Sequence, residues 1–239
     1  MKDYICLDLE MTGLDPKEER IIEIGAVKIV NGLVVDSFQA FANPNRKLKE
    51  EISAITGIKD EMLKDARSDW EIVQDFLIFS KDWPLVGHHM ITDIAFLKQC
   101  AVNHKETLTV RGVDTLYLAR KFLPAEISKT LTAVADYLEI PYSHGHRAME
   151  DAQMTYQIFT HLKNRFGETY PEYFRPKEIV YKVKKQGPIT AAQVRQLEAL
   201  LQYHHLSQSF EISHLTKNEA SRMIDKIILQ YGRIRSDDV

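Results

Sequence analysis

The sequence predicts an α/β fold in which a mixed sheet is flanked by helices and followed by a small C-terminal helical module. The first third of the chain alternates strand-like runs with turns, and the middle alternates short apolar strands with helical segments. The chain has 239 residues, 44% of them hydrophobic and 27% charged. This composition is typical of a globular protein with one substantial domain and a smaller one, and it excludes a largely disordered chain.

The N-terminal third predicts an antiparallel meander of three strands. Residues 4–10 form a compact apolar run, as expected of a central strand, and residues 12–16 carry turn residues. Residues 20–30 are rich in β-branched side chains, and Asn31-Gly32 is a strong hairpin signal. Residues 33–41 then return as the partner strand.

Short helical segments begin at Lys49, and a capping box at Ser68 and Glu71 predicts a helix that runs toward Ser80. Two further strands are expected, at residues 84–88 and 110–113. The helices expected around and after them span residues 92–101, 114–121, 130–138 and 147–166.

Near residue 171 this pattern stops. Prolines, glycine and lysines predict a linker over residues 171–187, so that residues 1–170 form the first domain and residues 188–239 the helical module. Thr190 and Thr216 each precede a helical pattern as candidate N-caps. Aromatic and basic side chains interleave in and around the linker, which suits either single-strand binding or a hydrophobic anchor.

The charges are unevenly distributed. Residues 1–172 carry 20 basic and 27 acidic side chains, a net charge of −7, whereas residues 173–239 carry 11 and 7, a net charge of +4. An acidic body suits metal binding and a basic tail suits a polyanion, and ordinary surface variation would give the same pattern.

Several absences in the sequence bear on location. Cys6 and Cys100 lie among apolar neighbours and cannot form a disulfide framework, which favours a reduced compartment. No run approaches the roughly 18 apolar residues of a membrane span, and the N-terminal residues lack a signal-peptide core. We therefore expect a cytoplasmic protein that does not contact a membrane.

Carboxylates interrupt the apolar runs at informative positions. Asp8 and Glu10 lie two residues apart on a strand that reads as buried, so both project from the same face. Two like charges there repel each other and lose solvation unless a cation is present. Asp93 stands at the start of a helix, where it could instead serve only to complement the helix dipole.

His146 and Asp151 lie at the start of a long helix whose Ala148 and Ala152 allow close packing on a sheet. Carboxylate ligands suit Mg²⁺ or Mn²⁺, and two such ions about 3.5–4 Å apart can hold the attacking and leaving oxygens of a phosphodiester. His146 would then take a proton from the attacking water. The pattern therefore predicts a phosphoryl-hydrolysis site.

Three segments, DLEMTGLD, GHHMITDIAFL and HRAMEDA, resemble the three motifs of the DEDDh exonucleases, which have a ribonuclease H-like fold. The resemblance covers residues 2–166, and its RIIEIGAVKI and VDTLYLAR segments are typical of the proofreading domains of bacterial replicative polymerases such as DNA polymerase III. It implies 3′→5′ removal of nucleotides. It also implies that Asp8, Glu10, Asp93 and Asp151 bind two metal ions and that His146 is the general base.

The same resemblance implies substrate contacts. Met11, Thr12 and Gly13 match the stretch that contacts the terminal nucleotide through its backbone, and Leu14 is either a wedge against the terminal base or a core residue.

The second motif departs from the family pattern. His88 corresponds to the family's usual histidine and is a candidate substrate-binding residue, whereas His89 and Thr92 replace the asparagine and phenylalanine of many relatives. The hydrogen bonding around the second motif is therefore expected to differ from that of the family, whereas the metal-ligand position, Asp93, is unchanged.

These observations predict a metal-dependent 3′→5′ exonuclease acting on single-stranded or frayed 3′ ends, with DNA as the favoured substrate. An exoribonuclease that trims RNA shares the same motifs. A non-catalytic adaptor that holds 3′ ends for a polymerase is the alternative from a different class. The C-terminal module is expected to bind nucleic acid, a polymerase or another protein.

Overall fold

The computed structural model describes residues 1–142, 146–183, 187–208 and 211–234. Contacts between Cα atoms divide the chain into two compact units. Unit 1 contains Met1–Pro44 and Leu48–Val183, and unit 2 contains Asn45–Lys47 and Lys184–Val239. Among the helices of the described residues, none has both the length and the apolar character that crossing a bilayer requires.

Unit 1 is built on a mixed sheet with the strand order β3-β2-β1-β4-β5-β6. The first three strands are antiparallel neighbours, as the sequence predicts, and β4 and β5 run parallel to β1. The strands are β1 (Tyr4–Met11), β2 (Ile21–Val30), β3 (Leu33–Phe41), β4 (Leu85–Gly87), β5 (Arg111–Asp114) and β6 (Lys177–Glu178).

The predicted hairpin between β2 and β3 is confirmed. Asn31 and Gly32 both have positive φ, 50° and 83°, as a two-residue turn with right-handed strand twist requires. Val30 pairs with Leu33 across this turn.

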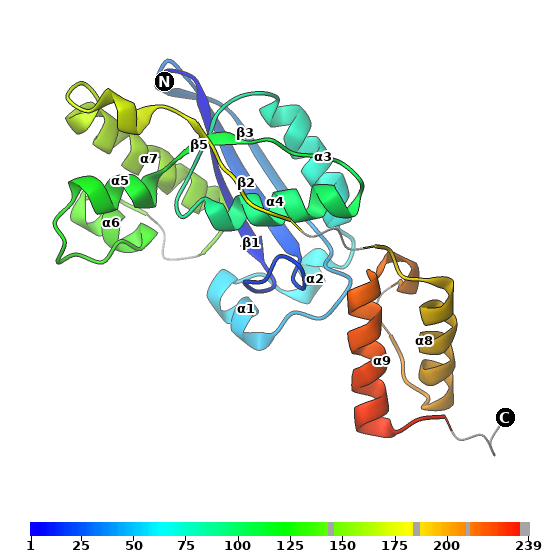
Figure 1. Ribbon diagram of the computed structural model, residues 1–239. Coiled ribbons are helices and arrows are strands. Elements are labelled where there is room, and N and C mark those ends of the chain that lie inside the picture. Colours follow the sequence, from blue (N-terminus) through cyan, green and yellow to red (C-terminus); the bar gives the residue numbers. More distant parts are fainter. Residues whose placement is uncertain (143–145, 184–186, 209–210, 235–239) are drawn as a thin grey trace. The chain divides into compact units, whose positions relative to one another are not determined.

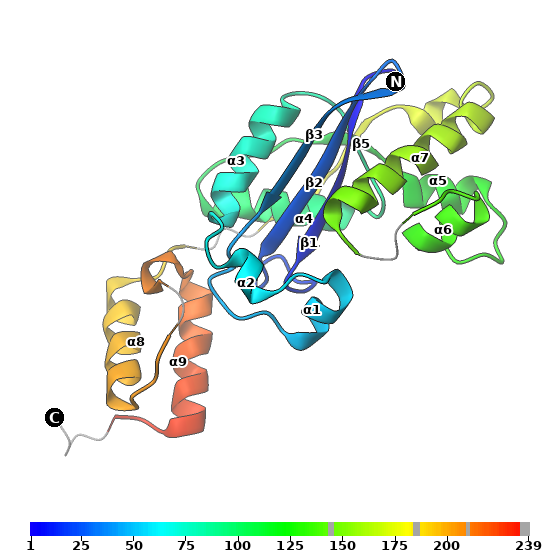
Figure 2. The same ribbon diagram turned by 180° about the vertical axis from the view of Figure 1, so that it is seen from behind.

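Helices cover both faces of the sheet. Figures 1 and 2 show α5, α6 and α7 together on one side of the strands and α3 and α4 on the other. The predicted helices are all present, within a few residues of their expected limits. They are α1 (Glu50–Thr56), α2 (Asp60–Leu63), α3 (Asp69–Ser80), α4 (Ile91–Asn103), α5 (Thr115–Phe122), α6 (Leu131–Tyr137) and α7 (Ala148–Phe166).

Alternate residues of β1 face two different cores. Tyr4 and Cys6 pack with residues of α5, α6 and α7, whereas Ile5, Leu7 and Leu9 pack with residues of α3 and α4. Because side chains alternate along a strand, Asp8 and Glu10 continue the row that faces α7.

The first part of the predicted linker is structured. Residues Pro171–Phe174 form the 3₁₀ helix η1, and Phe174 is only 4% exposed because it packs into the core beside α7. Residues 177–178 pair with β5 as β6. The hydrophobic anchor is therefore the correct interpretation of Phe174. Residues 184–186 of the expected linker lie outside the described residues, and the domain limits at 170 and 188 stay predictions.

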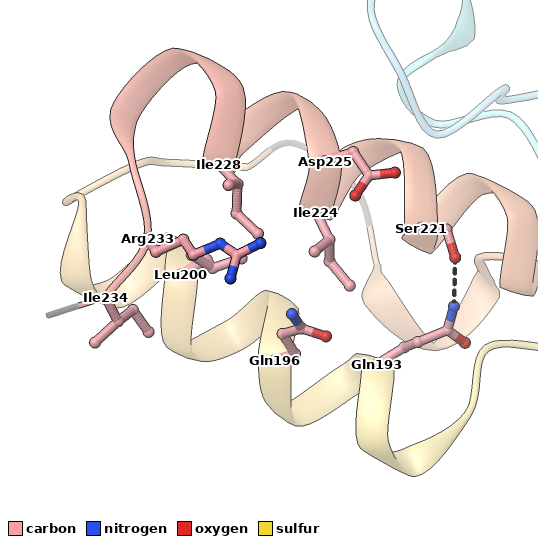
Figure 3. Close-up of a pocket in the computed structure, with 9 residues that line it drawn as sticks. All are labelled: Gln193, Gln196, Leu200, Ser221, Ile224, Asp225, Ile228, Arg233 and Ile234. Atoms are coloured by element: carbon pink, nitrogen blue, oxygen red, sulfur yellow. Dashed lines mark hydrogen bonds between the residues drawn. The ribbon is translucent and has the colours of Figure 1, made fainter. Parts of the chain in front are cut away.

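Unit 2 contains two parallel helices, α8 (Ala191–Tyr203) and α9 (Lys217–Tyr231), and the short 3₁₀ helix η2 (Ile212–His214). Both predicted N-caps are confirmed, since Thr190 and Thr216 each form a capping box. An isolated bridge between Pro188 and Thr216 holds the two N-terminal ends together. A groove of about 470 Å³ lies between α8 and α9. Figure 3 shows Leu200, Ile224 and Ile228 among its lining residues.

Candidate active site

Three of the four predicted ligands converge. Asp8 and Glu10 extend from β1 and Asp151 from the first turns of α7, and a ligand atom from each lies within 4.8 Å of the others. The donors are all carboxylate oxygens, which are the ligands that Mg²⁺ and Mn²⁺ prefer. The residues present therefore fit a hard divalent cation.

The helix that carries Asp151 approaches the sheet at a glycine. Gly25 of β2 pairs with Asp8, and a Cβ atom on Gly25 would lie 2.2 Å from the backbone of Ala148 and Met149. Only a residue without a side chain allows this approach. It sets Asp151 against the carboxylates of β1.

Asp93, the fourth predicted ligand, is not in this three-carboxylate group, although it lies close enough to influence it. It sits in the first turn of α4, is 5% exposed, and is the largest charged cause of the raised pKa of Asp8. Burial raises the pKa of Asp93 itself to about 8, and hydrogen bonds from its own backbone and that of Leu9 oppose this rise.

The carboxylates of the group resist ionisation in the protein alone. Burial, followed by the charge of Asp93, raises the pKa of Asp8 well above its ordinary value. Burial and the charge of Asp151 raise the pKa of Glu10 to about 8. Burial raises the pKa of Asp151 to about 6, and the charge of His146 lowers it. A divalent cation would relieve this accumulated negative charge.

His146 lies two residues before the first residue of α7. Its Nδ1 is 3.9 Å from Oδ2 of Asp151, and its side chain is 53% exposed. The imidazole is thus beside the carboxylate group and open to solvent, as a general base that must reach a water molecule requires.

In the loop after β1, Thr12 is fixed by hydrogen bonds and Leu14 is exposed to solvent. Thr12 is buried, its Oγ1 donates to Oε2 of Glu19 at 2.5 Å, and it accepts a hydrogen bond from the backbone of Arg20. Gly13 packs against Glu19, and Leu14 is 85% exposed. The alternative that Leu14 is a core residue is therefore wrong. Substrate contacts through Met11, Thr12, Gly13 and Leu14 stay a prediction.

Both ring nitrogens of His88 have partners inside the protein. Nδ1 lies 2.9 Å from Oγ1 of Thr115, and Nε2 lies 2.8 Å from the carbonyl oxygen of Lys129. The ring therefore ties the end of β4 to two other segments, and its predicted contact with substrate stays a prediction.

Asp114, which is not one of the predicted site residues, orders the second motif. Its carboxylate accepts hydrogen bonds from the backbone of His89 and Met90, each at 3.1 Å, and also caps α5. The available signal was an aspartate between a strand and a helix, a position that favours N-capping. The buried Glu23 was not among the predicted site residues either. The feature that could have indicated it is a single carboxylate within an apolar strand.

Comparisons with known proteins show the family of this chain. A family model described as Exonuclease (RNase_T) matches residues 5–159. The PolC-type DNA polymerase III of Caldanaerobacter subterraneus subsp. tengcongensis is 37% identical over 166 residues, which are 70% of this chain and 12% of that protein. The PolC-type enzyme of Thermotoga maritima is 40% identical over 158 residues, 65% of this chain and 11% of that protein. The chain thus spans only about a tenth of the length of these relatives.

Solved structures share the fold. Exonuclease X in complex with 5′ overhanging duplex DNA has a TM-score of 0.55 and 23% identity, over 69% of this chain and 93% of that one. E. coli exonuclease I in complex with a dT13 oligonucleotide has a TM-score of 0.60 and 16% identity, over 72% of this chain and 43% of that one. With the family match over more than half of its length, this chain belongs to the exonuclease family, as a DEDDh-like member related to the proofreading domains of DNA polymerase III.

Proposed function

We propose that this protein is a divalent-metal-dependent 3′→5′ exonuclease that hydrolyses the last phosphodiester bond of a single-stranded or frayed DNA end. The observation that carries the proposal is the convergence of Asp8, Glu10 and Asp151 within 4.8 Å of one another, beside His146. These side chains come from a strand and a helix more than 130 residues apart along the chain. Membership of the exonuclease family supports the reaction class.

Asp8, Glu10 and Asp151 would hold one or both ions, and Asp93 would complete the set from α4. Two bound Mg²⁺ or Mn²⁺ ions would supply charge for the attacking and leaving oxygens of the phosphodiester. His146 takes a proton from the attacking water, whose oxygen forms a bond to phosphorus while the bond from phosphorus to the 3′ oxygen breaks. The leaving oxygen gains a proton, and a nucleoside 5′-monophosphate departs.

The preference for DNA is supported by the relatives. The fold neighbours include exonucleases described in complex with DNA, and the relatives named above are PolC-type DNA polymerases III. An exoribonuclease that trims RNA remains the alternative within the same chemistry. A binding-only adaptor would derive no benefit from buried carboxylates that repel one another.

We infer that the C-terminal module joins this activity to a polymerase or another protein. In support, the PolC-type DNA polymerase III of Pediococcus pentosaceus is 28% identical over 244 residues, which include 95% of this chain. The similarity therefore extends beyond the exonuclease region into residues 188–239.

Both cysteines are free and buried, in keeping with the proposed cytoplasmic location.

The test is digestion of 5′-labelled single-stranded DNA, duplex DNA and RNA of one sequence, with Mg²⁺ or Mn²⁺. We expect a ladder of shortening products, strongest on single-stranded DNA, and none with Asp8→Ala. A faster ladder on RNA would favour the exoribonuclease. Mn²⁺ titration by calorimetry provides the second measurement, because absence of both binding and products would favour the adaptor.

A further inference from the structure

Glu23 is a buried carboxylate next to the candidate active site that the proposed reaction does not use. It lies on β2 directly opposite Glu10 of β1 and is 0% exposed. A charged group in such a place needs several hydrogen-bond partners. The structure provides four donors, from two different elements.

Two of these donors form a paired contact with Arg147, the residue before α7. Arg147 donates from Nε to Oε2 of Glu23 at 3.1 Å and from Nη2 to Oε1 at 3.0 Å. This arrangement fixes the direction as well as the distance of the guanidinium. The Arg147 guanidinium also lies 5.2 Å from the centre of the Phe41 ring.

The other two donors tie the carboxylate to the helix and to the next strand. The backbone N–H of Ala148, the first residue of α7, donates to Oε2 of Glu23 at 3.3 Å. Nε2 of Gln39 on β3 donates to Oε1 at 2.7 Å. Arg147 makes no side-chain hydrogen bond that caps α7, so Glu23 of β2 takes the role of the N-cap side chain.

The helix end held in this way carries both groups on which catalysis would depend. His146 is the residue before Arg147, and the N–H of Asp151 donates to the carbonyl of Arg147 at 2.9 Å. A shift of this end would move the imidazole and the carboxylate together. Displacements of about 1 Å are enough to slow reactions of this kind substantially.

The Glu23–Arg147 pair also holds His146 and Asp151 in place while adding little net charge to the site. Glu23 and Arg147 carry opposite charges and are joined by two hydrogen bonds of 3.0 and 3.1 Å. A lone arginine here would compete with a metal ion for the carboxylates. Paired with Glu23, it anchors the helix and leaves the group acidic.

We propose that Glu23 and Arg147 are positioning residues that lock the N-terminal end of α7 onto β2, and so set His146 and Asp151 in register with Asp8 and Glu10. This inference rests on the proposed function for its catalytic consequence. In this proposal the pair acts only through His146 and Asp151, the two groups that it places.

The first test uses two single variants of the full chain, Arg147→Ala and Glu23→Gln. Arg165→Ala, at the other end of α7, is the matched control. Loss of residues that orient metal ligands typically costs about 10–100-fold in metal affinity or activity. We expect a kcat about 10–100-fold lower, KM within about threefold, and Mn²⁺ binding about tenfold weaker by calorimetry. Hydrogen exchange should accelerate at the amides of residues 148–152 and stay unchanged in Arg165→Ala.

The second test separates positioning from stability. Removing one partner leaves an uncompensated buried charge and destabilises the protein, whereas replacing both with apolar residues is often neutral. We expect Glu23→Met/Arg147→Met to unfold at about the wild-type urea concentration and yet to keep a kcat at least about tenfold reduced. A double variant with wild-type kcat would overturn the proposal. If the double variant does not fold, the single variant Glu23→Gln tests the proposal instead. A wild-type kcat in Glu23→Gln, together with unchanged hydrogen exchange at residues 148–152, would then overturn the proposal.

These readouts distinguish the two proposals. A wild-type protein that cuts no nucleic acid would refute the proposed function. Hydrogen exchange and Mn²⁺ binding would still report whether Glu23 and Arg147 hold α7 in place.

Discussion

Asp8 of β1 pairs directly with Gly25 of β2, and the first turn of α7 rests on that same glycine. Asp8 is thus a candidate metal ligand, and Gly25 beside it leaves the space in which α7, the helix that carries Asp151, packs on the sheet. The position of the carboxylate group depends on the absence of a side chain at residue 25.

Substitution Gly25→Ala should damage both stability and activity. The added Cβ would lie 2.2 Å from the backbone of Ala148 and Met149, so α7 must move away from the sheet. Overpacking of this kind typically costs about 1–3 kcal/mol. We expect a lower free energy of unfolding in urea and weaker Mn²⁺ binding. Equal Mn²⁺ affinity in Gly25→Ala and wild type would show that the contact does not set the site.

Removal of one carboxylate should abolish metal-dependent hydrolysis while leaving the fold intact. In Asp8→Asn the side chain keeps its shape and loses the charge that would hold a cation. We expect hydrolysis to fall at least about 100-fold and calorimetric Mn²⁺ binding to weaken. The exposed Glu61→Gln on α2 is the control and should match wild type. Full activity of Asp8→Asn in the presence of a chelator would contradict the proposal.

Stability should depend on pH through Glu10. Burial raises its pKa from 4.5 to about 8, so its contribution to stability is complete below pH 4.5 and is lost as the pH rises toward 8. Glutamine cannot ionise, so metal-free Glu10→Gln should gain stability relative to wild type over this interval. One pKa unit corresponds to about 1.4 kcal/mol, and partial exposure reduces the effect, so we expect on the order of 2 kcal/mol at pH 8.

The measurement is urea unfolding of metal-free wild type and Glu10→Gln between pH 5 and pH 8. A difference that stays constant over this range would disprove the expected ionisation. Saturating Mn²⁺ provides a second comparison, because a bound cation favours the ionised carboxylate and should stabilise wild type more than the variant.

Removal of the His146 imidazole should slow hydrolysis without unfolding the protein. The side chain is 53% exposed, so its loss removes little packing. General-base catalysis typically contributes about 100- to 10,000-fold, and we expect kcat of His146→Ala to fall within that range. The melting temperature and Mn²⁺ affinity should stay close to those of wild type. A kcat within threefold of wild type would exclude His146 as the base.

The exposed Leu14 should matter for substrate and hardly for folding. At 85% exposure, Leu14→Ala should change the free energy of unfolding by less than about 0.5 kcal/mol. If Leu14 contacts the terminal base, KM for single-stranded DNA should rise several-fold. The exposed Leu229→Ala on α9 serves as the control. Unchanged KM in both variants would remove Leu14 from the substrate site.

Much of the fold, and the shared face of two candidate ligands, was predictable because the signals are local. Asp8 and Glu10 share a strand face by simple alternation, and the turn at Asn31-Gly32 fixes the register of β2 and β3. Thr190 and Thr216 cap helices through residues only three positions away.

Long-range partners were not predictable in the same way. Glu23 meets Arg147 across 124 residues, and nothing in the local sequence identifies that pairing. The two-residue strand β6 is too short to produce a pattern, and it exists because β5 offers it an edge. The sequence could not show that Asp93 lies outside the three-carboxylate group, because the placement of α4 on the sheet depends on packing between distant segments.

The two-sided alternation of β1 ties catalysis to the assembly of the whole sheet. A slip of β1 by one residue would bury Asp8 and Glu10 among the apolar side chains of α3 and α4 and turn Leu7 and Leu9 toward α7. No partly ordered or mispaired chain would then hold the carboxylates together. Nuclease activity recovered after denaturation should therefore come only from molecules in which β1 has its native register. Incompletely folded chains should cut no nucleic acid.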